Sequence, residues 1–95
     1  MKPFATLGNL ILDIRLQIER FPIRADEHQS AQALALEPGG AGNALVAAAR
    51  LGLRARALGH VGADWIGRHL LAQLAAEAVE TRDVALLPGE ATRAE

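Results

Sequence analysis

The feature of the sequence best suited to binding a ligand is a glycine-rich turn, Gly39-Gly40-Ala41-Gly42-Asn43. It precedes a run of small apolar residues at 44–51 that predicts a buried helix. Backbone N–H groups at the start of a helix have no intrahelical partner, and glycines let a ligand approach them closely. Hydroxyl groups or anions can therefore bind at such a turn. The alternative is that the glycines only make a tight strand-to-helix connection.

The second candidate is Asp13, which begins a stretch of alternating apolar and polar residues. A carboxylate at the end of a core strand can accept two hydrogen bonds from neighbouring hydroxyl groups. Taken alone, Asp13 is better explained as an ordinary solvated strand carboxylate. Together with Asn43 and the Gly39-Gly40 pair on the same chain, it predicts a sugar-type site.

Other chemistries fit the sequence less well. Gly40 and Gly42 give the first half of a dinucleotide fingerprint, but Leu45 occupies its third small position. A phosphate-binding P-loop needs a lysine after its glycines, and no lysine follows Lys2. The three histidines are dispersed, and there is one serine and no cysteine, which argues against a metal site or a Ser-His-Asp triad. We therefore predict no catalytic residue and no metal ligand in this chain.

Composition narrows the choice of partners and compartment. The 95 residues carry a formal net charge of −1 and a pI near 6.3, so no basic surface for nucleic acid is expected. The longest uncharged, mostly apolar run, residues 38–49, contains three glycines and does not predict a membrane span. The absence of cysteine fits a reducing compartment. The expectation is a soluble, cytoplasmic domain with no nucleic-acid or membrane partner.

Strands alternating with helices would position the candidate residues. The predicted strands cover residues 4–7, 12–19, 31–36, 55–61 and part of 79–87. The predicted helices cover residues 44–51, with Asn43 as N-cap and Gly52 as its end, and residues 65–78, with Asp64 as N-cap. This order is typical of an α/β fold with a parallel sheet of about three strands. The last of these strands would be an uncovered sheet edge.

Four stretches, in order along the chain, resemble the N-terminal part of the ribokinase-like (PfkB-type) carbohydrate kinases. They are Gly8-Asn9-Leu10-Ile11-Leu12-Asp13, Pro38-Gly39-Gly40-Ala41-Gly42-Asn43-Ala44, Ala49-Arg50-Leu51-Gly52 and Gly59-His60-Val61-Gly62-Ala63-Asp64-Trp65-Ile66-Gly67. The resemblance implies a partial ribokinase-like α/β core at residues 1–12 and 37–95, with a parallel sheet flanked by helices. It implies a small β lid at residues 13–36.

The resemblance also implies roles for single residues. Asp13 would hold sugar hydroxyls at the hinge of the lid, and Gly39, Gly40 and Asn43 would line the other side of the sugar. Asn9 is a further substrate-binding candidate, at a position that varies among substrate classes. Because the first motif is also similar to adenosine kinases, a nucleoside is an alternative substrate.

The sequence departs from the family in one major respect. Such kinases are much longer, and a second signature, Asp-Thr-x-Gly-Ala-Gly-Asp, supplies their catalytic base and anion hole beside the ATP site. This chain has no such motif. We therefore expect an N-terminal fragment of an ATP-dependent sugar or nucleoside kinase, inactive alone and binding no cofactor itself, with Mg-ATP implied for the complete enzyme. The lid could form a homodimer contact. The alternative is a non-catalytic binding or assembly module.

Overall fold

The structure, a computed structural model, describes residues 2–95. Its elements are β1 (Pro3–Leu7), β2 (Leu10–Gln17), β3 (Ala33–Gly40), α1 (Ala41–Arg50), β4 (Arg54–Gly62), α2 (Trp65–Ala76), β5 (Val84–Leu87) and β6 (Arg93–Ala94). This order confirms the predicted alternation of strands and helices. The short strand β6 was not predicted.

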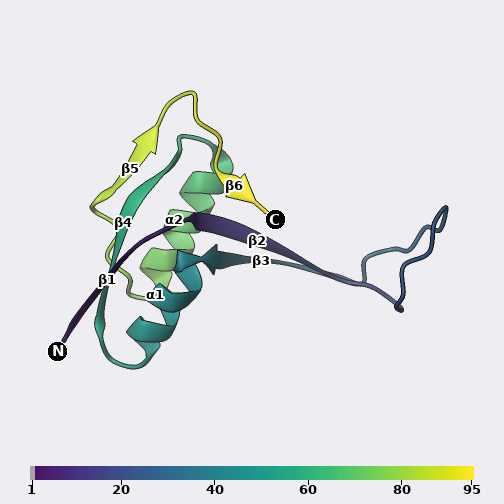
Figure 1. Cartoon of the computed structure of the whole chain (residues 1–95), viewed down its shortest axis with the longest axis horizontal. Coiled ribbons are helices and arrows are strands. Elements are labelled where there is room, and N and C mark those ends of the chain that lie inside the picture. Colours follow the sequence, from purple (N-terminus) through teal and green to yellow (C-terminus); the bar gives the residue numbers. More distant parts are fainter. Residues whose placement is uncertain (1) are drawn as a thin grey trace.

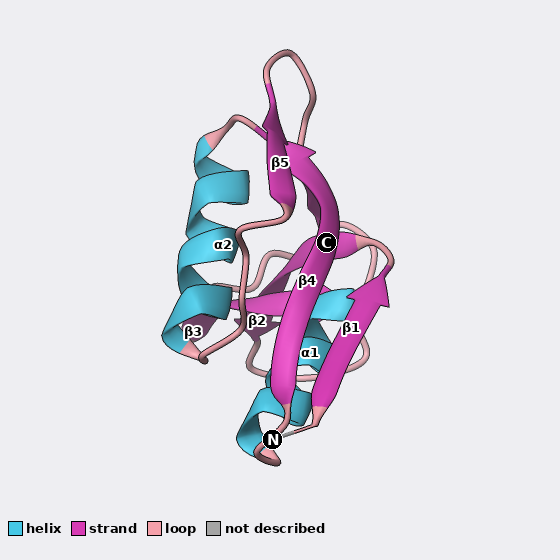
Figure 2. Cartoon of the chain, turned by 90° about the vertical axis from the view of Figure 1, so that its left-hand side faces the viewer, coloured by secondary structure: helices cyan, strands magenta, loops and turns pink. Residues whose placement is uncertain are grey.

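Strands β1, β4 and β5 form a parallel sheet with β4 at its centre. Parallel neighbours need a crossover, which α1 provides between β1 and β4 and α2 provides between β4 and β5. Both helices lie on the same side of this sheet (Figures 1 and 2). Ala55 and Ala57 of β4 are fully buried, whereas Arg54 and Arg56, which alternate with them, are at least partly exposed. The predicted α/β class is confirmed, and none of the helices in residues 2–95 is long and apolar enough to cross a membrane.

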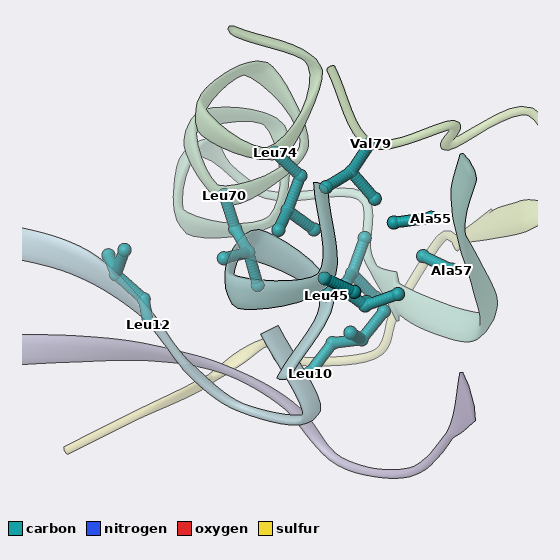
Figure 3. Close-up of a cluster of buried hydrophobic side chains, with 10 residues drawn as sticks. Leu10, Leu12, Leu45, Ala55, Ala57, Leu70, Leu74 and Val79 are labelled. Atoms are coloured by element: carbon teal, nitrogen blue, oxygen red, sulfur yellow. The ribbon is translucent and has the colours of Figure 1, made fainter. Parts of the chain in front are cut away.

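The hydrophobic core lies between the two helices and the parallel sheet. Figure 3 shows leucines converging on small residues of β4, and the group comprises Leu10, Leu45, Ala55, Ala57, Leu70, Leu74 and Val79. Leu45 of α1 and Leu70 and Leu74 of α2 are fully buried. Because alanines occupy the facing positions of β4, the larger helix side chains can pack closely against the strand. The fully buried Leu12 lies farther along β2 (Figure 3).

A second sheet has the order β3-β2-β6. Strands β2 and β3 pair antiparallel from Leu10↔Gly40 to Gln17↔Ala33, and they project from the body as an arm with residues 18–32 at its far end (Figure 1). The predicted pairing of two strands is confirmed. The predicted turn at residues 39–43 is not a separate loop, because residues 39–40 end β3 and residues 41–43 begin α1. Pro38 is compatible with this position since β3 is an edge strand.

Helix α1 starts earlier than predicted. It begins at Ala41, and its N-cap is Gly40 with φ +56° and no side-chain capping bond. Asn43 was predicted to be this cap, which was wrong, because Asn43 lies inside the first turn. The Ala41 N–H donates instead to the backbone oxygen of Asn9 at 2.8 Å. The sharp direction change therefore depends on the left-handed conformation that glycine accepts without strain.

The start of α2 and the end of α1 lie close to the positions that the sequence predicted. Asp64 is the N-cap of α2, and its Oδ1 accepts a bond from the Gly67 N–H at 2.7 Å, as predicted. Helix α1 ends at Arg50, and Gly52 follows with φ +87°. That left-handed residue just past the helix is the terminating glycine that the sequence predicted.

Candidate functional site

The carboxylate of Asp13 lies directly against the backbone of Gly39. Asp13 is opposite Glu37 in the β2–β3 register, so Gly39 is its diagonal neighbour on the same face. A methyl group at Gly39 would overlap the carboxylate carbon and both oxygens of Asp13. Glycine is needed here because the half-buried Asp13 side chain occupies the place of a β-carbon. The structure thus brings these two predicted residues together.

Among residues 2–95, no other side chain or backbone group forms a hydrogen bond or ion pair with the Asp13 carboxylate. Its oxygens therefore keep hydrogen-bonding capacity for donors outside the chain. The cation nearest to it in sequence, Arg15, pairs instead with Glu37. That hydrogen bond raises the pKa of Arg15 above its ordinary value.

Gly40, the residue after Gly39, packs against the backbone of Asn9. A methyl group at Gly40 would overlap the backbone oxygen of Asn9, and the same oxygen accepts the Ala41 N–H. Gly40 therefore allows the close approach of two backbone segments, from the β1–β2 connection and the start of α1. The Asn9 side chain is exposed beside this contact.

Asn43 lies apart from the Asp13–Gly39 contact. It lines an open groove of about 760 Å³ between α1, α2 and the edge of β3, which we call the helix groove. Two ion pairs line this groove, Arg15 with Glu37 and Arg50 with Glu77. Asp13 and Gly39 are not among the residues that line this groove. No described contact joins Asn43 to Asp13.

A second hollow, of about 360 Å³, lies at the carboxyl ends of β1 and β4, and we call it the edge pocket. Its lining residues are Leu7, Gly8, Asn9, Leu10, Gly59, His60, Val61, Gly62, Ala91, Thr92 and Arg93. In open α/β sheets ligands bind outside the carboxyl ends of the strands. This pocket has that position and includes the predicted residue Asn9.

Thr92 forms a buried junction that the sequence did not reveal. Its hydroxyl donates to Asp64 Oδ1 at 2.7 Å and accepts the Gly62 N–H at 2.9 Å, and its own N–H donates to Asp64 Oδ2 at 2.8 Å. The bond from the Thr92 N–H, followed by those from its hydroxyl and from Gly67, lowers the pKa of Asp64. We call this set the Asp64–Thr92 clamp.

The clamp explains the glycines around it and the course of the last residues. A side chain at Gly67 would overlap the backbone oxygen of Gly62, and one at Gly62 would overlap the backbone of Glu90. Just beyond the clamp, β6 pairs parallel with β2 in the register Ile11↔Arg93. The clamp therefore places β6 directly beside the strand that carries Asp13. No local pattern at residues 90–95 predicts this, because it depends on pairing with distant residues.

The fold and these contacts define an α/β protein whose candidate ligand-binding groups gather at strand ends. The chain belongs to the pfkB family carbohydrate kinases, whose family model matches residues 1–94. A comparison with curated proteins finds no match. The predicted family is therefore confirmed.

Solved structures of similar proteins agree with this assignment. A fructokinase from Vibrio cholerae is 28% identical with a TM-score of 0.74, and the match covers 99% of this chain and 28% of that one. The ribokinase of Arabidopsis thaliana, solved with ribose and ATP, is 26% identical with a TM-score of 0.73, covering 96% of this chain and 30% of that one. A protein of E. coli described as a putative ribokinase II, solved with ATP and magnesium, is 25% identical with a TM-score of 0.76. The match covers 99% of this chain and 30% of that one. The chain thus spans less than a third of the length of these structures.

Proposed function

We propose that this chain supplies the sugar-binding groups of an ATP-dependent carbohydrate kinase. The observation that carries the proposal is the Asp13 carboxylate, which lies against Gly39 and makes no bond within residues 2–95. A carboxylate held in this way can accept hydrogen bonds from two neighbouring hydroxyls, and such charge-assisted bonds are among the strongest that proteins make. A side chain at position 39 would remove the space that the carboxylate uses.

The remaining candidates are assigned lesser roles in the same proposal. Gly40 allows α1 to begin directly against the backbone oxygen of Asn9. Asn9 and Asn43 offer amide groups on the edge pocket and the helix groove. The division into a core at 1–12 and 37–95 and a lid at 13–36 stays a prediction, as does the cytoplasmic location. The substrate class proposed is a small sugar, with a nucleoside as the alternative.

Phosphoryl transfer belongs, in this proposal, to the complete enzyme with Mg-ATP. Within residues 2–95, no three acidic or histidine side chains converge as they could around a metal ion. We therefore assign none of these residues to magnesium or to the nucleotide. Phosphoryl transfer depends on positioning and charge stabilisation of the transferred group, for which this chain offers no identified residue.

Titration of the full 95-residue chain with ribose, fructose and adenosine, followed by NMR, tests the proposal. We expect chemical-shift changes centred on the amides of Asp13, Gly39 and Gly40. ATP turnover is measured on the same samples with each sugar, and none is expected. Shift changes confined to other surfaces would contradict the assigned site, and sugar-dependent ATP turnover would contradict the division of labour.

The arm gives a specific reason to propose a homodimer. Leu16 and Leu34 are directly opposite each other in the β2–β3 register and are 56% and 62% exposed, and Ile14 on the same face is 42% exposed. This face continues the buried side of β2 beyond the body of the protein (Figure 1). A second copy of the arm would cover these side chains with a matching apolar face.

Replacing Leu16 by lysine is expected to weaken this dimer by at least about tenfold, because a charge would be buried opposite an apolar surface. Sedimentation equilibrium over a range of concentrations measures the effect. Leu51→Lys, at an exposed position on the body, is the matched control and should leave association unchanged. A monomeric wild-type chain would reject the dimer. Stable capture of a different protein by the arm would favour the assembly-module alternative.

A further inference from the structure

Arg93 lies on the same face of the second sheet as Asp13. The β2–β6 register places Arg93 beside Ile11, and directly opposed residues of neighbouring strands share a face. Ile11 is opposite Gly39 on its other side, and Asp13 is two residues farther along β2. Arg93, Ile11 and Gly39 therefore form one row across the sheet, beside the row that contains Asp13.

Glu95 occupies the matching position beside Asp13. Its N–H donates to the Leu12 oxygen at 3.0 Å, and its oxygen accepts the Ile14 N–H at 2.5 Å. Asp13 thus lies between Glu37 and Glu95, and of these three carboxylates only that of Asp13 has no arginine partner within residues 2–95. An anionic group on a ligand would be repelled at Asp13, so hydroxyl groups are the suitable ligands there. The neighbouring row offers the guanidinium of Arg93 instead.

The edge pocket, which Arg93 helps to line, contains no acidic lining residue. Among its lining residues, all of which lie within 2–95, the polar side chains are those of Asn9, His60, Thr92 and Arg93. The Thr92 hydroxyl already forms the hydrogen bonds of the clamp. The groups that remain to contact a ligand are an amide, an imidazole and a guanidinium. Its volume of about 360 Å³ is at the lower end of the range of small-molecule sites. The pocket therefore suits a small group that is negatively charged.

The existing partner of Arg93 does not prevent such binding. Arg93 Nη2 lies 2.6 Å from Glu95 Oε1, and the two side chains are 63% and 53% exposed. Exposed ion pairs of this kind contribute little to stability, so the guanidinium can turn to a ligand at small cost. A carboxylate or phosphate would then gain the bidentate geometry that arginine offers to both groups.

We propose that the ligand of this chain is an acidic sugar, whose hydroxyls bind Asp13 and whose carboxylate or phosphate binds Arg93 in the edge pocket. The proposal rests on the sugar-binding function proposed above and specifies its substrate class. Arg93 determines specificity in this assignment, since neutral and acidic sugars share the hydroxyls and differ in the charged group.

The experiment compares matched neutral and acidic ligands on the full chain at constant ionic strength. Calorimetry and NMR titration use ribose, ribonate, ribose 5-phosphate and inorganic phosphate. We expect at least one acidic sugar to bind about tenfold more tightly than ribose, with shift changes at both Gly39 and Arg93. Ribonate and ribose 5-phosphate distinguish a carboxylate from a phosphate as the preferred group.

Three variants make the assignment specific. Arg93→Gln should abolish the preference, so that the acidic sugar binds no more tightly than ribose. Glu95→Gln should strengthen binding of the acidic sugar about two- to fivefold, because it removes the competing carboxylate. Arg82→Gln is the control, since Arg82 is exposed, lies 3.8 Å from Glu80 and does not line the pocket.

The outcomes separate this inference from the function on which it rests. Ribose binding at Gly39 with no preference for either acid overturns the acidic-sugar assignment and leaves the sugar site intact. A preference that survives Arg93→Gln overturns the role of Arg93. Binding of inorganic phosphate without any sugar response at Gly39 overturns both the acidic-sugar assignment and the sugar site.

Discussion

Replacing Gly39 by alanine is expected to weaken sugar binding by this chain strongly while leaving it folded. The new methyl group would occupy the space now filled by the Asp13 carboxylate, which must rotate away from the strand pair. Because that carboxylate is the end of a flexible side chain, its displacement should cost the fold little. The ligand, in contrast, loses charge-assisted hydrogen bonds, so its affinity should fall by about tenfold to a hundredfold.

Asp13→Asn provides the complementary change. It keeps the shape of the side chain but replaces a carboxylate with a neutral amide that has only one acceptor oxygen. If the carboxylate is the group that binds hydroxyls, Asp13→Asn and Gly39→Ala should weaken sugar binding to a similar extent. The double variant should then bind the sugar no more weakly than either single variant, because both changes remove the same interaction.

Calorimetric titration with the best-binding sugar measures these affinities, and circular dichroism reports the fold. Ala33→Val is the matched control, since it adds methyl groups on the same face of β3 at the far end of the strand pairing. It should leave binding unchanged. Full affinity in Gly39→Ala would show that the position of the Asp13 carboxylate is irrelevant to the ligand.

The comparison of sequence and structure explains why this contact could be predicted only in part. Asp13 and Gly39 were each proposed from residue type and from their combination on one chain, although each alone has an ordinary structural explanation. Their contact, however, depends on the register Asp13↔Glu37. A shift of one residue would move Asp13 to the other face of the arm, and alternation alone does not distinguish registers.

The start of α1 illustrates a second limit. Asn is a favourable N-cap and glycine favours turns, so the sequence predicted a turn at residues 39–43 and a helix after Asn43. In the structure β3 continues to Gly40, and the helix begins at once because the Ala41 N–H finds an acceptor on Asn9. That acceptor comes from the connection after β1, which no local pattern around Asn43 could indicate.

Elements whose signals are local were predicted more accurately. The strict alternation after Leu12 identified β2, and Asp64 identified the start of α2 through the capping bond that it makes. By contrast, β6 has only two residues and exists because it pairs with β2 and because Thr92 is fixed by the clamp. Short strands of this kind depend on tertiary contacts rather than on intrinsic preference.

The second large effect is expected from replacing Thr92 by valine. Valine has nearly the same shape but has no hydroxyl, so the buried Gly62 N–H loses its acceptor and Asp64 loses a donor. A buried amide without a partner costs about 1–3 kcal/mol of the free energy of unfolding. Because Thr92 is 8% exposed, water does not readily replace the lost hydroxyl. Residues 90–95 should also lose order.

Urea denaturation at pH 7 measures this loss, and Thr6→Val is the matched control. Thr6 lies on β1, is partly buried, and its hydroxyl makes no hydrogen bond within residues 2–95. The control should therefore change the free energy of unfolding little. Equal losses in the two variants would mean that the Thr92 hydroxyl has no special role in stability.

Acidification should distinguish the clamp from simple packing. The Asp64 pKa is lower in the folded chain than its ordinary value, chiefly because the Thr92 N–H and hydroxyl bind its charged form. A carboxylate of this kind stabilises the fold above its unfolded pKa, and this contribution is lost as the pH falls through the folded pKa. Glu77 adds to the trend, since Arg50 lowers its pKa.

The wild-type free energy of unfolding should therefore fall as the pH drops below about 4. In Thr92→Val the Asp64 pKa is depressed less, so the variant should lose less stability over the same range. The difference between wild type and Thr92→Val should be largest at pH 7 and should narrow by pH 3, whereas the Thr6→Val difference should stay constant. If the difference in free energy of unfolding between wild type and Thr92→Val is independent of pH, the effect of Thr92 comes only from its bond with the Gly62 N–H. If this difference narrows as the pH falls, the charged Asp64 contributes to the clamp that holds β6 beside the strand of Asp13.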